Sequence, residues 1–227
     1  MSPQSAVGGP QVADRRSHVA VLDYGMGNLR SVEKAIERVG VAVMVASDVE
    51  VAAGADGLVL PGVGAFPKAM ARIRELGLDR LIADRLAAGT PVLGICLGFQ
   101  LLFERSSEFE GAEGLGLVAG DVDGLRAPGF KVPHIGWEPV RWERECELTA
   151  GIGNATPFYF VHSFAPRPAD SADVLGTAEH GERFACAIAR PPLYGVQFHP
   201  EKSSGAGLRL LRNFAAICAR AAASQPA

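Results

Sequence analysis

The stretch PVLGICLGFQLLF, residues 91–103, joins a short apolar run to a segment whose apolar residues recur at helical spacing. We interpret the first part as a buried strand and the second as a helix that begins at about Leu97. Cys96 lies at the junction between Gly94 and Gly98, the spacing of the G-x-S-x-G nucleophile elbow with sulfur in place of oxygen. Because glycines permit a tight turn, the pattern predicts that Cys96 is a nucleophile held at the end of a strand.

The start of the predicted helix favours an ionised thiol. The amide N–H groups of Leu97 and Gly98 have no partner within the helix, and the helix dipole is positive there. Both features favour thiolate over thiol at Cys96. The alternative is that Cys96 packs in the core as a small apolar residue.

The first half of the chain alternates strands and helices, with short connections. We expect strands at residues 18–23, 41–46, 57–62 and 91–95, and helices at residues 29–39, 68–76 and 78–88. Asn28 is predicted to cap the first helix and Gly40 to end it. This alternation predicts parallel strands covered on both faces, with the glycine-rich turns after Asp23, Leu60 and Ile95 opening at the ligand-binding edge of the sheet.

The second half is rich in predicted strands, and residues 173–189 are expected to form a hairpin about His180 and Gly181. A final helix is predicted at residues 205–220. The fold class that we predict is α/β, with an open mixed, mostly parallel sheet, helices on both faces and an antiparallel β extension. Residues 18–222 are assigned to one domain, flanked by disordered ends at 1–17 and 223–227.

Composition excludes several classes of function. The 227 residues are 48% hydrophobic, and 22 basic against 25 acidic residues leave a net charge of -3. Without a basic excess or an apolar run of roughly 20 residues, we expect neither nucleic-acid binding nor a membrane span. The start of the chain lacks the apolar region of a signal peptide. The four cysteines form no C-x-x-C pair, so we expect no metal, no cofactor and no disulfides, in a cytoplasmic protein.

A base for Cys96 is predicted in the segment GVQFHPEKS, residues 195–203. Pro200 biases His199 toward extended geometry, and if the segment stays extended His199 and Glu201 project to the same side. Glu201 can then orient the imidazole while its other nitrogen faces the thiol. The alternative is a surface turn with two polar residues.

The combination of thiol, imidazole and carboxylate implies acyl transfer through a thioester, and that reaction needs an oxyanion hole. The N–H of Leu97 is one candidate donor. The second is the peptide of Val63 in the loop PGVGAF, because Gly62 and Gly64 allow unusual dihedrals on either side of it. A simple turn between strand and helix is the alternative for this loop.

Taken together, GICLGFQLLF and FHPE resemble the class I (triad-type) glutamine amidotransferases. The motifs LDYGMGNLRSVEKA, LPGVGAF, VPHIGW, FYFVHSF and GVQFHPEKS resemble, more narrowly, the glutaminase subunits of imidazole glycerol phosphate synthases. This resemblance implies hydrolysis of glutamine to glutamate and ammonia. It also implies a heterodimer with a (β/α)8-barrel cyclase that uses the ammonia in histidine biosynthesis, to make imidazole glycerol phosphate and an aminoimidazole carboxamide ribotide.

The resemblance also implies roles for individual residues. Cys96, His199 and Glu201 match the catalytic triad, and Val63 and Leu97 match the oxyanion donors. The positions that match the glutamine-binding residues are Gln100, Glu108, Ser163 and Phe164. The positions that match the cyclase-facing residues are Asn28, Trp137, Tyr159 and Lys202. Glu138 departs from the family pattern, in which asparagine is expected after the tryptophan, and puts a detail of the interface in doubt.

Three rival interpretations remain. The first is a nucleotide-binding protein, suggested by Gly25 and Gly27 after the first predicted strand. It is disfavoured because Arg30 occupies the position of the third glycine in the dinucleotide-binding motif G-x-G-x-x-G. A stand-alone thiol hydrolase would be fully active without a partner. A non-catalytic regulatory subunit is disfavoured because Cys96, His199 and Glu201 are all present. Within the family, another amidotransferase, of anthranilate or pyridoxal phosphate type, is disfavoured by DYGMGN, PGVGAF and PHIGW.

Overall fold

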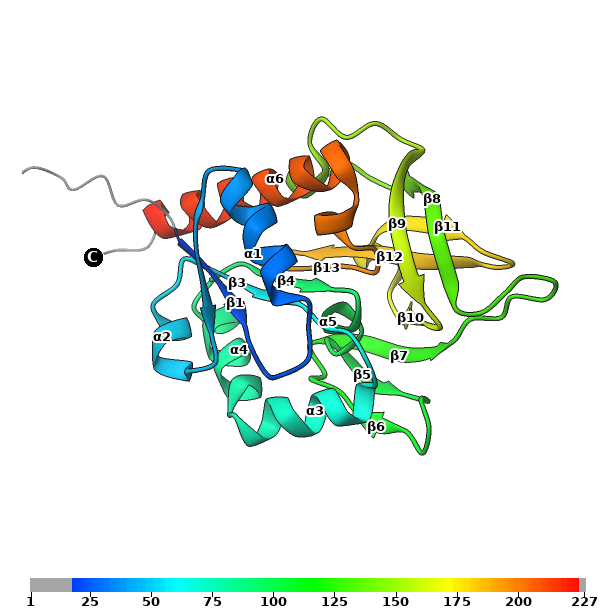
Figure 1. Cartoon of the computed structure of the whole chain (residues 1–227), viewed down its shortest axis with the longest axis horizontal. Helices are drawn as coiled ribbons and strands as arrows, with labels where there is room; N and C mark the ends of the chain where they lie inside the picture. Colours follow the sequence, from blue (N-terminus) through cyan, green and yellow to red (C-terminus); the bar gives the residue numbers. More distant parts are fainter. Residues whose placement is uncertain (1–17, 225–227) are drawn as a thin grey trace, which may run out of the picture.

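The computed structural model describes residues 18–224 and is built on a nine-stranded sheet with the order β2-β1-β3-β4-β13-β12-β11-β8-β9. Neighbours among the first five strands pair in parallel; they are β2 (Ala42–Ala46), β1 (His18–Leu22), β3 (Gly57–Leu60), β4 (Val92–Ile95) and β13 (Leu193–Val196). The other four continue the sheet in antiparallel pairs; they are β12 (Arg183–Arg190), β11 (Val174–Glu179), β8 (His134–Trp142) and β9 (Thr156–His162). The predicted mixed sheet with an antiparallel extension is therefore confirmed (Figure 1).

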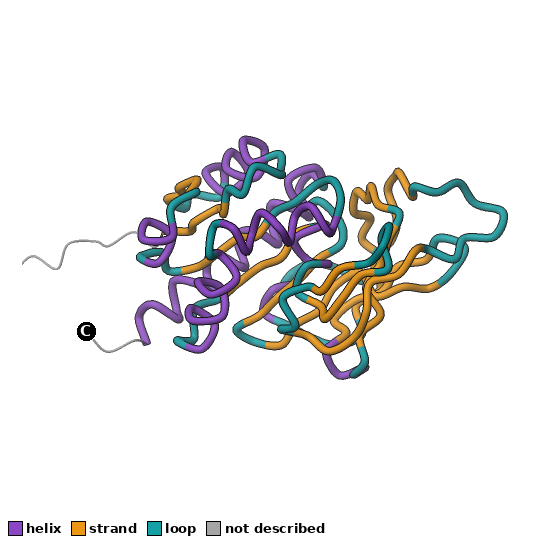
Figure 2. Tube along the Cα trace, turned by 90° about the horizontal axis from the view of Figure 1, so that it is seen from below, coloured by secondary structure: helices purple, strands orange, loops and turns teal. Residues whose placement is uncertain are grey.

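Helices cover the parallel half of this sheet on both sides, whereas the other end of the molecule consists mostly of strands and loops (Figure 1 and Figure 2). On one side lie α1 (Leu29–Arg38) and α6 (Ser204–Ser224), and on the other lie α2 (Val49–Ala53), α3 (Phe66–Glu75) and α4 (Leu78–Ala87). Successive strand residues point to opposite faces. Accordingly Val19 and Val21 of β1 pack in the core under α1 and α6, whereas Ala20 and Leu22 pack in the core under α3 and α4.

A second sheet was not predicted. It has four strands in the order β10-β7-β5-β6, which are Phe164–Pro168, Val118–Gly124, Phe103–Ser106 and Ala112–Glu113. It exists because the helix expected after Cys96 is only one turn long, α5 (Leu97–Gln100). The carbonyls of Leu101 and Leu102 accept hydrogen bonds from Leu115 and Leu117, which pull the chain into strand geometry directly after α5.

Several predicted details differ from the structure. Asn28 precedes α1 but makes no side-chain capping bond, whereas Gly40, at φ 88°, does end that helix as predicted. The short helix α2 was not predicted; Asp48 caps it by accepting the N–H groups of Glu50 and Val51. The hairpin about His180 and Gly181 is present as predicted. Three 3-10 turns complete the fold: η1 (Glu147–Thr149), η2 (Ser171–Asp173) and η3 (Pro200–Lys202).

The ends of the chain bear on two predictions. Helix α6 continues four residues past the predicted end at Arg220, through a run of alanines that favour helix. The predicted disordered end at residues 223–227 is therefore wrong for Ala223 and Ser224, which lie in α6. The rest of the predicted disorder, at residues 1–17 and 225–227, lies outside the described residues. Within residues 18–224, no helix combines the length and the apolar character that a bilayer crossing requires.

The close approach of β3 to α5 allows a first prediction. A Cβ on Gly98 would lie 1.8 Å from the carbonyl oxygen of Leu60, so Gly98→Ala must push the two segments apart. We expect a loss of about 2 kcal/mol or more in the free energy of unfolding, measured by denaturant titration. Gly205→Ala is the matched control because a Cβ there meets nothing within 4 Å. Equal stability of the two variants would contradict the prediction.

Candidate active site

The nucleophile elbow predicted at Cys96 has the expected backbone. Cys96 follows β4 directly and has φ 55° and ψ -110°, a conformation that non-glycine residues rarely adopt. Its side chain is only 6% exposed. The Sγ atom lies 3.9 Å from the carbonyl oxygen of Val161, and the side-chain amide of Gln197 donates to it at 3.8 Å.

His199 and Glu201 form the predicted pair, although by a different local route. His199 is extended, but Pro200–Lys202 forms the turn η3 and does not continue the strand. The Nδ1 atom of His199 lies 2.7 Å from Oε1 of Glu201, and both side chains are almost fully buried. The Nε2 atom of His199 is buried and has no hydrogen-bond partner among the described residues, which leaves it available to the thiol.

The surroundings of His199 favour its protonated form. Burial alone would lower its pKa, but the interactions with Cys96 and then Glu201 outweigh burial and raise the pKa to about 9. An imidazole that is stable as a cation beside a thiol supports a thiolate–imidazolium pair.

The three glycine-rich turns meet beside Cys96, as predicted. The hydroxyl of Tyr24, in the turn after β1, donates to the carbonyl of Pro61 at 2.7 Å. A Cβ on Gly62 would lie 2.3 Å from that hydroxyl and 3.0 Å from Cβ of Leu97, so Gly62 is held between the other two turns. The N–H of Leu97, a predicted oxyanion donor, donates to the carbonyl of Gly62 at 3.4 Å.

A cavity of about 260 Å³ opens onto the thiol. Seven of the predicted site residues line it: Val63, Cys96, Leu97, Gln100, Glu108, Ser163 and Phe164. A larger hollow of about 1060 Å³ lies elsewhere, between Trp142, η1 and Tyr194, and contains none of the predicted site residues. The smaller cavity is the candidate site because its thiol stands on the strained backbone of Cys96, with the polar side chains of Gln100 and Glu108 beside it.

Gln100 is not on a solvent-facing helix. It is buried, and its Nε2 donates to the carbonyl of Phe164 at 2.9 Å and to Oε1 of Gln197 at 3.1 Å. Gln197 also contacts Cys96, so the two glutamines link the cavity wall to the nucleophile. Because Nε2 is fully used, only Oε1 of Gln100 is left for a ligand, as an acceptor.

Glu108 is tied to the start of α3. Its Oε2 accepts the N–H of Phe66 at 2.7 Å, which supplies the helix cap that Ala65 cannot provide. Phe66 is the last residue of the PGVGAF loop. Glu108 therefore joins the cavity wall to the loop that carries the predicted oxyanion donor Val63.

Three of the predicted interface residues cluster on the outer face of β8 and β9. Trp137 is 49% exposed, and its ring meets the ring of Tyr159 edge to face, at 6.0 Å between centroids. The Nζ atom of Lys202 lies 5.8 Å from the centre of the Tyr159 ring. Asn28 precedes α1, which packs against the same turn η3 that carries Lys202.

Two residues of the site were missed from sequence. Tyr24 holds the PGVGAF loop, and burial and then the charge of Cys96 raise its pKa, so it remains a neutral donor. Gln197 precedes His199 by two residues and so shares its face of the segment, a spacing that could have identified it.

Comparison with known proteins agrees with this geometry. Residues 20–218 match the model of the class-I glutamine amidotransferase family. The chain is 50% identical over 196 residues to an imidazole glycerol phosphate synthase subunit HisH of Moorella thermoacetica, covering 86% of this chain and 93% of the relative. It is 49% identical to the HisH subunit of Aquifex aeolicus, covering 86% and 94% respectively.

A solved structure described as a glutamine amidotransferase has the same fold, with a TM-score of 0.70 and 23% identity over 88% of this chain and 98% of that chain. The chain therefore belongs to the class-I glutamine amidotransferase family and, within it, to the HisH subunits of imidazole glycerol phosphate synthase.

Proposed function

We propose that this amidotransferase subunit hydrolyses glutamine to glutamate and ammonia through a thioester on Cys96, with His199 as the proton carrier and Glu201 as its orienting partner. The observation that carries the proposal is the arrangement of the three groups. A buried carboxylate holds Nδ1 of the imidazole at 2.7 Å, and a thiol stands on a strained elbow at the mouth of a cavity.

The chemistry takes two steps. The thiolate of Cys96 attacks the side-chain amide carbon of glutamine, and His199 gives its proton to the departing ammonia. Water then attacks the thioester; His199 takes a proton from the water and returns it to the sulfur as glutamate leaves. Glu201 keeps the imidazole in one tautomer throughout.

The cavity supplies groups suited to glutamine. The free Oε1 of Gln100 and the carboxylate of Glu108 are both acceptors, which suits an α-ammonium group. Ser163 and Phe164 line the same cavity, and the carbonyl of Phe164 accepts a hydrogen bond from Nε2 of Gln100. We assign these four residues to glutamine binding.

The oxyanion hole requires a rearrangement before it can act. The N–H of Leu97 is directed at the carbonyl of Gly62 and must be released to stabilise an oxyanion. Because Gly62 and Gly64 flank Val63, the peptides of this loop can rotate at low cost. We infer that the loop is switched when the partner binds, so that glutamine is not hydrolysed wastefully.

The ammonia is delivered to a cyclase subunit, which we expect to be a (β/α)8 barrel that forms a heterodimer with this chain in the cytoplasm. The outer face of β8 and β9 suits an interface because it exposes Trp137 and Ile135 beside the cavity-lining residue Val161. Exposed aromatic and aliphatic side chains that gather in this way mark protein interfaces.

Loss of the thiol tests the mechanism. Cys96→Ala should lower the rate of glutamate formation by roughly 10³-fold or more, because no thioester can form. Its affinity for the cyclase should stay unchanged, measured by calorimetry. Cys146→Ala is the control, since Cys146 is a free, partly exposed thiol outside the cavity. A Cys96→Ala chain that retained the parental rate would refute the mechanism.

Activation by the partner tests the function. Glutaminase activity of the isolated chain should be low and should rise about 10²-fold with a cyclase and its ligand, because the oxyanion hole is then completed. Trp137→Ala should shift the cyclase concentration that gives half activation upward, while Val51→Ala, at an exposed apolar residue on α2, should not. Equal rates with and without cyclase would favour a stand-alone thiol hydrolase.

The His199–Glu201 pair predicts a pH-dependent stability. Because the folded pKa of His199 is about 9, above its ordinary value of 6.5, the protonated imidazole stabilises the folded chain. This stabilisation is complete below about pH 6.5 and is lost as the pH rises through about 9. Glu201→Gln should therefore cost about 1–2 kcal/mol more near pH 6 than near pH 10, measured by urea unfolding.

The control for this measurement is Glu75→Gln, which breaks the exposed ion pair with Arg72 on α3. It should change the free energy of unfolding little at either pH. A cost of Glu201→Gln that does not vary with pH would show that Glu201 has no influence on the protonation of His199.

A further inference from the structure

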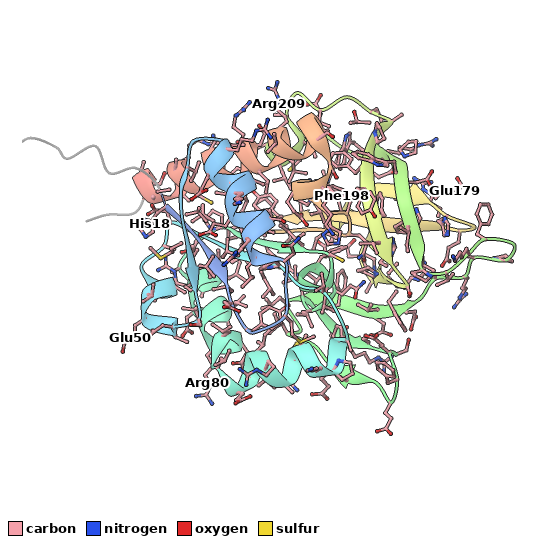
Figure 3. The ribbon with its side chains drawn as sticks, viewed as in Figure 1. His18, Glu50, Arg80, Glu179, Phe198 and Arg209 are labelled. Carbon is pink, nitrogen blue, oxygen red and sulfur yellow. The ribbon has the colours of Figure 1, made fainter. Side chains whose placement is uncertain are left out.

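A second cluster of ionisable side chains lies outside the proposed glutaminase machinery. One ligand atom each from His134, Glu138 and His180 lies within 4.8 Å of the other two. His134 and Glu138 are four residues apart on β8 and so share its inner face. The register of β8 with β11, continued by a few residues, brings His180 at the hairpin tip opposite Glu138. Figure 3 labels Glu179, which marks this end of the molecule.

A chain of hydrogen bonds fixes the tautomer of His134. The carbonyl of Phe164 only accepts, so Nδ1 of His162 donates to it at 2.9 Å. In the neutral ring, Nε2 of His162 is then an acceptor, and Nδ1 of His134 donates to it at 3.3 Å. Neutral His134 is left with a lone pair on Nε2.

That lone pair faces a carboxylate. The Nε2 atom of His134 lies 3.6 Å from Oε2 of Glu138, beyond hydrogen-bond range. An imidazole lone pair and a carboxylate oxygen are both acceptors and repel each other unless a cation lies between them. Two ligands of a tetrahedral zinc ion stand about 3.3 Å apart, given bonds of about 2.0–2.1 Å, so the spacing suits a metal better than a proton.

His180 completes the donor set. Its Nε2 donates to the carbonyl of Lys131 at 2.9 Å, so Nδ1 carries the lone pair. Its ring stacks on that of His134, with the centroids 4.0 Å apart. His180 therefore adds a third possible ligand to the pair of His134 and Glu138, within the 4.8 Å that separates the ligand atoms of the cluster.

We propose that His134, Glu138 and His180 form a binding site for a divalent transition-metal ion of the zinc class, with the fourth position left to water. Two imidazoles and one carboxylate are a donor set that zinc accepts. The hydrogen bond from Nδ1 of His134 to His162 provides the outer support that metal-binding histidines require.

Binding requires one movement. An imidazole binds a metal in the plane of its ring, so two stacked parallel rings cannot both bind one ion. The ring of His180 must tilt away from His134, and it can do so because it lies partly exposed at the tip of a hairpin.

A metal at this position would join β8 to the hairpin tip and to the loop through Lys131, next to the glutamine cavity. Pro133 and His162 line that cavity and adjoin His134, the one along the chain and the other through its hydrogen bond. The ion would therefore brace one wall of the cavity and take no part in the hydrolysis.

The test is metal binding by the full-length chain carrying Cys96→Ala, which removes the active-site thiol as a competing ligand. Zn²⁺ and Co²⁺ are titrated by calorimetry and by the visible absorption of bound Co²⁺. We expect one ion per chain, without thiolate-to-cobalt charge-transfer absorption. His180→Ala should abolish binding, and Glu138→Gln should weaken it about tenfold or more.

His18→Ala and Glu50→Gln are the matched controls, because Figure 3 shows both residues on the opposite side of the molecule from Glu179. Both should bind metal like the parent. Thermal unfolding without metal verifies that each variant is folded, and Zn²⁺ should raise the midpoint of the parent but not that of His180→Ala. Failure to bind either ion at about 1 mM, or equal binding by His180→Ala and His18→Ala, would overturn the proposal.

Discussion

The contact on which the site depends is that of Gly98 with the carbonyl of Leu60, where even a methyl group would not fit. This contact sets the chain leaving β4 against the turn that leaves β3, and it leaves Cys96 at φ 55°. A backbone of this kind costs about 1–3 kcal/mol and persists only where the surrounding packing enforces it. Here Tyr24 and Gly62 complete the packing, so the strain of the elbow and the position of the PGVGAF loop have the same origin.

A second constraint brings the proposed base, His199, close to the proposed nucleophile, Cys96. Strands β4 and β13 are parallel neighbours, and their register pairs Gly94 with Gly195. Both lack side chains because Phe99 of α5 lies against them; a Cβ on Gly195 would stand 2.2 Å from its ring. Cys96 and His199 follow these glycines closely, so one buried phenylalanine sets the spacing of two residues about a hundred positions apart in sequence. The arrangement of the proposed triad is thus a consequence of sheet register.

The sequence predicted the elements that have a regular pattern of apolar side chains. It did not predict those features that depend on backbone hydrogen bonds between separate segments. Apolar periodicity predicted the parallel strands and most helices, and the motif residues of the cavity were found by resemblance. The short α5 was not predictable, because the carbonyls that end it are taken by Leu115 and Leu117, far along the chain. Asn28 has the right residue type for a cap, but its side chain makes no capping bond.

The side chains of β8 alternate between the two faces of the sheet, and each face has a different character. Ile135 and Trp137 point outward and are exposed, whereas His134 and Glu138 point inward toward the hairpin of His180. The departure from the family pattern at Glu138 therefore falls on the face away from Trp137, and it leaves the apolar outer surface intact. Since a strand is stiff along its length, an ion bound on the inner face would reduce the motion of the outer one. The proposed metal site and the proposed cyclase interface therefore share the strand β8. They are chemically independent, because neither uses a side chain of the other.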